Sequence, residues 1–293
     1  MKPSPLVYHR SESVADAVDA LGRYGSDAAV LAGGQSLVPM LNLRLARPSA
    51  LVDVFHLQEL RYLRGGGGGL RVGANTTQRT LETAPTEALH GFEVLREAVR
   101  WVGHYPVRTR GTVGGSIAHA DPAAELPLLA VLLDAEVGLA GSDGDRWVPA
   151  AAFFRGYMTT ARAPDELVVE LRIPPLEGAA SFTEHARRHG DFGIVLAGAT
   201  LVMHGAVCRS ARIALGGVAS APVRFPDVEQ QLEGSELDDE AVNEAAALVA
   251  TSLDPPADAQ FTAAYRRQLA AALVRRCLRT LRAPVAARAD GPR

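Results

Sequence analysis

The sequence almost lacks lysine: Lys2 is the only one among 293 residues, and arginine supplies the rest of the positive charge. Without a lysine inside the chain, a Walker-type phosphate loop cannot be built. A lysine next to the chain end is also a poor candidate for a Schiff base with pyridoxal phosphate. Arginine can still bind phosphates in a bidentate manner.

Cysteine is equally scarce, with Cys208 and Cys277 far apart and no C-x-x-C pair. Two isolated cysteines cannot build a zinc site or an iron–sulfur cluster, so we expect two reduced, buried thiols. The pair His119-x-Asp121 could hold a metal, but a hydrogen-bonded histidine is the commoner case, and we predict no metal site. There is no Gly-x-Ser-x-Gly elbow and no evident nucleophile–base pair, so we predict no catalytic residue.

Aromatic residues make up only 5% of the chain and the net charge is −3, which argues against nucleic acid as a partner. No run approaches the ~20 apolar residues of a transmembrane helix, and residues 1–10 have no apolar core of a signal peptide. With 47% hydrophobic and 22% charged residues, the composition is that of a soluble globular protein, expected to be cytoplasmic.

Two glycine segments are the strongest positive signal. They are Ala32-Gly33-Gly34-Gln35-Ser36-Leu37 and Gly111-Thr112-Val113-Gly114-Gly115-Ser116. A Gly-Gly pair beside a small hydroxyl residue can bend sharply and present its N–H groups to an anion. Two such segments predict a clamp for a ligand with two phosphates, and therefore a dinucleotide. The alternative is that each pair only forms a tight turn.

Charged residues flank the second segment. Arg108 and Arg110 precede it, and Asp121 and Glu125 follow it at the start of a predicted helix. These carboxylates either accept hydrogen bonds from cofactor hydroxyl groups or compensate the helix dipole. The five consecutive glycines 65–69 predict only a hairpin turn, since they lack the spacing of a Rossmann turn.

Hydrophobic periodicity divides the chain at Pro174-Pro175-Leu176-Glu177-Gly178. Before this linker, helices are predicted over 13–24, 37–45, 89–102 and 122–134, with short strands between them. After it, strands over 181–185, 194–204 and 212–218 precede helices over 239–250 and 262–281. Strands followed by helices predict a second, α+β domain.

Longer motifs around both glycine segments carry a family resemblance. The first segment continues with Val38-Pro39, Arg44-Leu45-Ala46-Arg47-Pro48 and Leu51-Val52-Asp53. The second lies within Arg108-Thr109-Arg110-Gly111-Thr112-Val113-Gly114-Gly115-Ser116-Ile117-Ala118-His119-Ala120-Asp121-Pro122-Ala123-Ala124-Glu125-Leu126-Pro127, and Gly190-Asp191-Phe192 forms a third element. The chain resembles the FAD-binding medium subunit of the molybdenum hydroxylases, the family of carbon monoxide dehydrogenase and xanthine dehydrogenase.

This resemblance implies an α+β fold, with a two-subdomain FAD-binding domain followed by a smaller α+β C-terminal domain. The expected boundaries are 1–176 for the FAD-binding domain and 177–285 for the C-terminal domain. Residues 286–293 are expected to form a disordered tail.

The resemblance also implies a set of FAD-binding residues, with the pyrophosphate at the first segment and the flavin ring near Phe192. The set is Ala32, Gly33, Gly34, Gln35, Ser36, Leu37, Val102, Gly103, Thr112, Gly115, Ser116, Asp121, Glu125, Leu167, Val168 and Phe192. Three positions depart from relatives. Ser116 replaces an asparagine, Phe192 replaces a tyrosine, and the stretch Glu184-His185-Ala186-Arg187-Arg188 lacks a lysine found in some of them.

The implied function is electron transfer. FAD is expected on this chain, with the molybdenum cofactor on a large partner subunit and two [2Fe–2S] clusters on a small one, in a dimer of heterotrimers. Electrons would pass from the clusters to FAD and then to an external acceptor. The cysteine count agrees, because this chain cannot hold the clusters itself. The alternatives are a stand-alone FAD-dependent oxidase or reductase, and a nucleotide-binding module without catalysis, which would be colourless.

Overall fold

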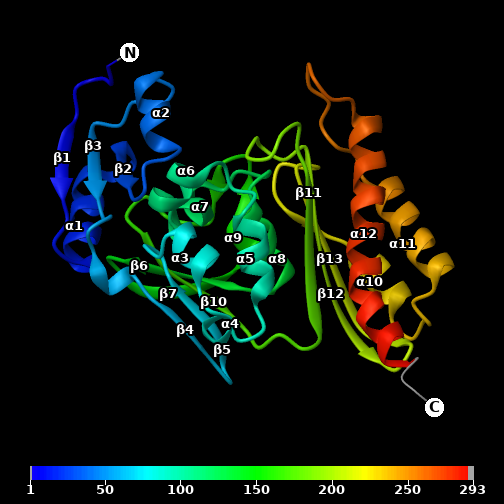
Figure 1. The fold of residues 1–293 in the computed structure, drawn as a ribbon. Helices are drawn as coiled ribbons and strands as arrows, with labels where there is room; N and C mark the ends of the chain where they lie inside the picture. Colours follow the sequence, from blue (N-terminus) through cyan, green and yellow to red (C-terminus); the bar gives the residue numbers. More distant parts are fainter. Residues whose placement is uncertain (1, 290–293) are drawn as a thin grey trace.

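The computed structural model describes residues 2–289, which form two adjoining parts (Figure 1). The N-terminal part contains a small parallel sheet and a larger antiparallel sheet with helices between and around them. The C-terminal part is one antiparallel sheet with helices packed on its outer face. The predicted α+β architecture is confirmed.

The small parallel sheet precedes the first glycine segment and positions it. Its strand order is β1 (Val7–Arg10), β3 (Ala50–Asp53), β2 (Ala28–Leu31). Helix α1 (Val14–Tyr24) packs on β3 and begins as predicted at Ser13, whose hydroxyl accepts a hydrogen bond from the Asp16 N–H at 3.1 Å. The glycine segment follows the carboxyl end of β2 and leads into α2 (Leu37–Asn42).

The larger sheet is antiparallel, with strand order β4-β5-β10-β6-β7. The glycine run 65–69 lies in the β4–β5 hairpin, as predicted. The strands are β4 (Leu63–Gly66), β5 (Gly69–Gly73), β6 (Glu136–Gly141), β7 (Gly144–Pro149) and β10 (Leu167–Ile173), and a short hairpin is formed by β8 (Phe154–Gly156) and β9 (Thr159–Thr160).

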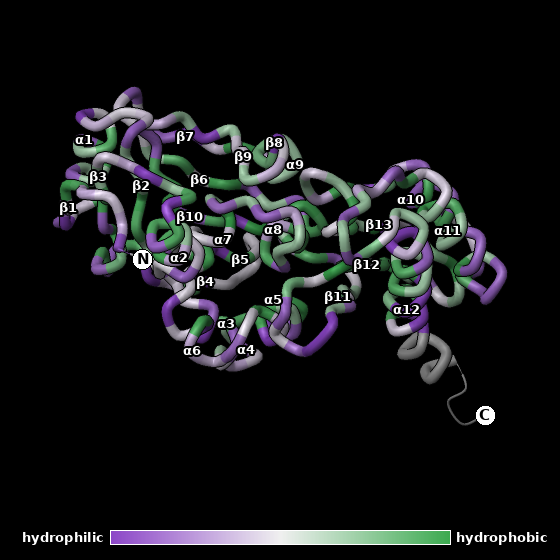
Figure 2. Tube along the Cα trace, turned by 90° about the horizontal axis from the view of Figure 1, so that it is seen from above, coloured by the Kyte–Doolittle hydropathy of each residue, from purple (hydrophilic) through white to green (hydrophobic). Residues whose placement is uncertain are grey.

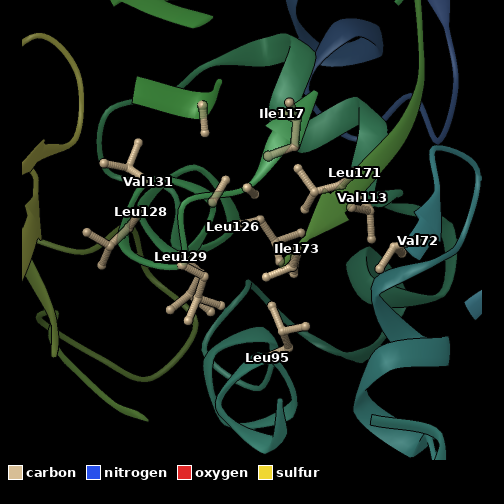
Figure 3. Close-up of a cluster of buried hydrophobic side chains, with 14 of the residues drawn as sticks. Val72, Leu95, Val113, Ile117, Leu126, Leu128, Leu129, Val131, Leu171 and Ile173 are labelled. Carbon is tan, nitrogen blue, oxygen red and sulfur yellow. The ribbon is translucent and has the colours of Figure 1, made fainter. Parts of the chain in front are cut away.

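Helices pack on this sheet around a continuous apolar core (Figure 3). Its centre is α8 (Glu125–Leu132), every residue of which is buried. Leu126 and Leu129 lie beside Ile173 of β10 and Leu95 of α5. The other helices of this part are α3 (Gln78–Thr83), α4 (Thr86–Leu89), α5 (Glu93–Val99), α6 (Tyr105–Arg110), α7 (Val113–His119) and α9 (Ala150–Phe153), with 3₁₀ turns at Gly25–Asp27 and Gln58–Leu60.

The C-terminal sheet separates two apolar cores. Its order is β11 (Ala179–His185), β12 (Val195–His204), β13 (Val207–Gly216), β14 (Val223–Arg224). One face packs on α8 and α5; the other packs on α12 (Ala263–Ala289), beside α10 (Pro226–Leu232) and α11 (Asp239–Ser252) (Figure 1). Hydrophobic segments therefore run through the middle of the molecule, as along β6 and β12 in Figure 2.

Three predicted helices differ from the structure at their ends. The helix predicted over 89–102 is broken, because His90 and Gly91 adopt left-handed backbone conformations with φ of 48° and 91°. The helix predicted over 122–134 begins only at Glu125, because Oδ1 of Asp121 accepts the Ala123 N–H at 2.9 Å and forms a turn first. The helix predicted over 37–45 stops at Asn42. Helices α3, α6, α9 and α10 were not predicted.

The C-terminal helix overlaps the predicted tail over 286–293, since α12 continues to Ala289; residues 290–293 lie outside the described part of the chain. Among residues 2–289, no helix combines the length and apolarity that crossing a membrane requires.

Candidate functional site

A cavity of about 570 Å³ opens between the small parallel sheet, helices α6 and α7, and the loop between β11 and β12. This volume is typical of cofactor sites. All sixteen residues predicted to bind the cofactor line it, from Ala32 in the first glycine segment to Phe192 in the C-terminal part. The structure thus brings the whole predicted set together; that these residues contact FAD stays a prediction.

The first glycine segment presents free donors to the cavity. Gly34 has a φ of +73°, a conformation that favours glycine. Within residues 2–289, the backbone N–H groups of Gly34, Gln35 and Ser36 have no hydrogen-bond acceptor, while the Gln35 side chain is tied to the Gly33 carbonyl at 3.1 Å. Consecutive unpaired N–H groups at a cavity wall fit a pyrophosphate.

The second segment has a different role, and the prediction that it too presents free N–H groups is wrong. Gly114 and Gly115 lie in the first turns of α7, not in a loop. The Val113 N–H donates to Thr76 O at 2.9 Å, and the Gly114 N–H to Ala74 O at 2.8 Å. The Gly115 N–H donates to Oγ1 of Thr112 at 3.0 Å. This segment therefore forms part of the cavity wall and contributes the Ser116 side chain to it, but it does not present a row of backbone donors.

The two segments are in direct contact. A Cβ atom built on Gly33 would lie 2.0 Å from the Arg110 carbonyl oxygen and 2.9 Å from Cα of Gly111. The second segment also packs closely on the residue that follows β5: a Cβ on Gly114 would lie 2.4 Å from Cβ of Ala74. The glycines at these positions are required for close packing of backbone on backbone, which holds the cavity walls together.

The two arginines before the second segment do not line the cavity. Arg108 is buried and forms an ion pair with Glu82, with Nε and Oε2 at 2.9 Å. Its Nη1 also donates to the carbonyl oxygens of Val102 and Gly103, each at 3.1 Å. The Arg110 guanidinium stacks over the Phe55 ring at 4.0 Å. Arg108 therefore holds the 102–103 wall in place, and the suggestion that either arginine reaches a phosphate is not supported.

Both carboxylates after the second segment line the cavity. Asp121 caps the turn before α8, yet it also lines the cavity. Glu125 lines the cavity as the first residue of α8 and is only 9% exposed. Burial raises the pKa of Glu125 to about 7, with a smaller contribution from the charge of Asp121. Burial therefore outweighs the favourable helix dipole at this position.

The C-terminal part closes one side of the cavity with residues 190–192. Its loop is packed against the other domain: the His189 ring lies 5.1 Å from the Trp101 ring, and a Cβ on Gly190 would lie 2.6 Å from Cε1 of His104. Phe192, in contrast, is 82% exposed at the cavity wall. Its ring is thus available to a bound ligand.

Sequence reasoning missed four polar residues that line the cavity: Asn75, Gln78, His104 and Arg162. Nη1 of Arg162 donates to the carbonyl oxygens of Ala163 and Glu166, at 2.9 and 2.7 Å. Gln78 is buried, and its Oε1 has no hydrogen-bond partner in the structure. Asn75 and Gln78 flank a Thr-Thr helix start that could have indicated them, whereas Arg162 lies in no recognisable pattern. Among residues 2–289, no group of His, Cys, Asp or Glu side chains is arranged to hold a metal ion.

Comparison with known families matches both parts of the chain. Residues 3–176 match the FAD binding domain in molybdopterin dehydrogenase, and residues 180–281 match the CO dehydrogenase flavoprotein C-terminal domain. Among curated proteins, the 6-hydroxypseudooxynicotine dehydrogenase complex subunit alpha of Paenarthrobacter nicotinovorans is 37% identical, covering 95% of each chain. The carbon monoxide dehydrogenase medium chain of Afipia carboxidovorans is 35% identical, covering 97% of this chain and 99% of that one.

Solved structures agree with these matches. The fold superposes on quinoline 2-oxidoreductase from Pseudomonas putida 86 with a TM-score of 0.93 and 36% identity, covering 97% of this chain and 99% of that one. It superposes on carbon monoxide dehydrogenase from Hydrogenophaga pseudoflava with a TM-score of 0.92 and 35% identity, with the same coverage. The chain therefore belongs to the FAD-binding medium-subunit family of the molybdopterin dehydrogenases.

Proposed function

We propose that the chain holds FAD in this cavity and relays electrons from the [2Fe–2S] clusters of a small partner subunit to an external acceptor. When bound, FAD supplies the chemistry of accepting and releasing electrons, which no side chain provides. A large partner subunit carries the molybdenum cofactor, and the complex is a cytoplasmic dimer of heterotrimers. The proposed domain boundaries are 1–176 and 177–285, which lie close to the bounds of the two family matches.

One observation carries the proposal: three consecutive N–H donors of residues 34–36 have no partner within the described part of the chain, at the wall of a cavity that all sixteen predicted residues line. Neutral backbone donors can bind a diphosphate without a lysine, and the one lysine of this chain is Lys2, which does not line the cavity. The residues therefore fit the cofactor that the family match implies.

The chain's own residues have distinct tasks in this proposal. The first glycine segment binds the pyrophosphate, and Ser116, Asp121 and Glu125 contact the sugar and ribityl hydroxyl groups. Leu167 and Val168 provide an apolar wall for a ring. Phe192, on the C-terminal side of the cavity, would contact a ring of the bound cofactor.

The proposal of partner subunits rests on the position of the two cysteines and on the relatives of the chain. Cys208 and Cys277 are both buried in the C-terminal core, so they cannot ligate a cluster together with an outside group. The relatives quoted above are subunits of dehydrogenases. Electrons must then reach this cavity from another chain.

Purification of the complex from its native host tests the proposal. We expect three co-purifying chains, about one FAD per copy of this chain, and iron and molybdenum in the same fractions. Rapid mixing with substrate should bleach the iron–sulfur absorbance before the flavin absorbance. A yellow, iron-free single chain that oxidises an organic substrate by itself would instead establish the stand-alone oxidase or reductase. A colourless chain would contradict both.

A further inference from the structure

The loop 186–194 connects β11 to β12 and carries the residues that close the cavity from the C-terminal domain, namely 190–192. Among the described residues, two backbone hydrogen bonds lie within this segment. The Ile194 N–H donates to His185 O at 2.8 Å and closes the loop, and the Asp191 N–H donates to Arg188 O at 3.1 Å. A loop with so few internal hydrogen bonds depends on contacts from other elements to keep one conformation.

Two consecutive residues of α12 hold both ends of this loop. The hydroxyl oxygen of Tyr265 lies 3.2 Å from Nε2 of His185, the last residue before the loop. Nη1 of Arg266 donates to Ile194 O, at the last residue of the loop, with a distance of 2.5 Å. The first turn of α12 therefore fixes the loop where it leaves β11 and where it enters β12.

Arg266 also connects the loop to the FAD-binding domain. Its Nη1 donates to a second carbonyl oxygen, that of Gly217, at 2.9 Å. The Gly217 N–H in turn donates to Pro122 O at 2.8 Å, next to Asp121, which lines the cavity. A Cβ on Gly217 would lie 2.6 Å from Ile194 O, so the two carbonyl groups that Arg266 binds are in close contact. One guanidinium group thus joins two segments that reach the cavity from different domains.

The guanidinium group of Arg266 is itself held in one orientation. Arg266 is only 9% exposed, and its Nη2 donates to Oδ2 of Asp258 at 2.7 Å. Oδ1 of Asp258 accepts the N–H groups of Gln260 and Phe261 at 2.7 and 2.8 Å, so the segment before α12 orients this carboxylate. Charge-assisted hydrogen bonds from a planar guanidinium to fixed acceptors are strong and directional.

We propose that Arg266, assisted by Tyr265, is a positioning residue for the cofactor, because it fixes the loop 186–194 in the conformation that places Phe192 at the cavity. Neither Arg266 nor Tyr265 lines the cavity, so both act through the loop. A loop that is already held in its bound conformation loses less entropy when the ligand binds. This inference rests on the proposed function, since it requires the flavin of FAD next to Phe192.

Binding of FAD and of ADP to the full chain tests this proposal, because ADP carries the pyrophosphate but no flavin. In Arg266→Gln, FAD affinity should fall about tenfold, while ADP affinity should change by less than about twofold. The visible circular dichroism of the bound flavin should also decrease, because its surroundings are less fixed. Tyr265→Phe removes one hydroxyl group and preserves the fold, and it should weaken FAD binding by about two- to threefold.

Arg267→Gln is the matched control. Arg267 is the next residue of α12, and it donates to Leu253 O at 2.8 Å and pairs with the exposed Asp254 instead of the loop. It should keep the wild-type Kd for both ligands.

Equal losses of FAD and ADP affinity in Arg266→Gln would show a general structural role and overturn the proposal. Unchanged FAD binding in Arg266→Gln and in Tyr265→Phe would overturn it as well. If Arg266→Gln does not fold, the FAD and ADP affinities of Tyr265→Phe decide in the same way. A wild-type chain that binds no FAD would instead overturn the proposed function itself.

Discussion

The backbone of Gly33 runs against the carbonyl group of Arg110, so closely that a Cβ atom on Gly33 would lie 2.0 Å from that oxygen. The contact joins the two glycine segments, one after β2 and the other before α7. Any side chain at residue 33 must push them apart, and the row of free N–H groups at residues 34–36 moves with the first of them.

Gly33→Ala should therefore weaken FAD binding by at least about tenfold, since a pyrophosphate site tolerates little displacement. Titration of the FAD-free chain, followed by flavin fluorescence, measures the Kd. Gly67→Ala is the control, because a Cβ on that hairpin residue meets no atom within 4 Å. An unchanged Kd in Gly33→Ala would show that the two segments do not set the site.

Arg108→Met should destabilise the chain by about 2 kcal/mol, because it removes a buried guanidinium and leaves the half-buried Glu82 carboxylate with only Arg79 as its ion-pair partner. The Val102 and Gly103 carbonyl groups lose their donor as well, so FAD affinity should fall together with stability. Urea unfolding measures the loss. Arg279→Met, in an exposed pair with Asp239, should change stability by less than about 1 kcal/mol. Equal effects of the two substitutions would refute the positioning role of Arg108.

The stability of the FAD-free chain should decrease as pH rises from neutral into the alkaline range. The pKa values of Glu125 and Glu184, about 7 and about 9, are raised by burial, so the folded state binds more protons than the unfolded state between the ordinary glutamate range and these values. Each such proton lowers the free energy of unfolding by about 1.4 kcal/mol per pH unit as pH increases. Urea unfolding between about pH 6 and pH 9 measures how the free energy of unfolding changes with pH. In Glu184→Gln it should be shallower; a steeper slope would contradict the assignment.

Phe192→Ala should leave stability within about 0.5 kcal/mol, because the ring is 82% exposed and contributes little to the core. FAD affinity should nevertheless fall roughly two- to tenfold, the value of one aromatic contact. Tyr157→Ala is the control, as Tyr157 is exposed but does not line the cavity. Loss of stability without any change in Kd would place the ring in the fold rather than at the ligand.

Some features could be predicted from the sequence because they depend only on residues close to one another along the chain. The helix start at Ser13, the hairpin of glycines 65–69 and the linker at 174–178 each depend on neighbouring residues. The convergence of all sixteen predicted residues on one cavity came from two long, specific motifs. Periodicity alone would not have placed Phe192 at the same cavity as the first glycine segment.

The remaining features depend on contacts between distant parts of the chain. Whether Gly114 donates to a ligand is decided by Ala74, and whether Arg108 reaches a phosphate is decided by Glu82. The left-handed conformation of His90, which breaks a predicted helix, has no side-chain signature. The sequence named Glu184 only within a stretch that lacks a lysine found in some relatives, and its burial arises from the packing of the C-terminal sheet on the FAD-binding domain.

The loop that carries residues 190–192 completes the cavity from the second domain, so a ligand seated there touches both halves of the chain at once. Its binding free energy is then added to the cohesion between the domains. A chain cut at the linker would lose the cavity wall at residues 190–192 and also the ligand's contribution to holding the two domains together. The fraction of chains that retain the cofactor therefore indicates the fraction in which the second domain has folded and packed against the first.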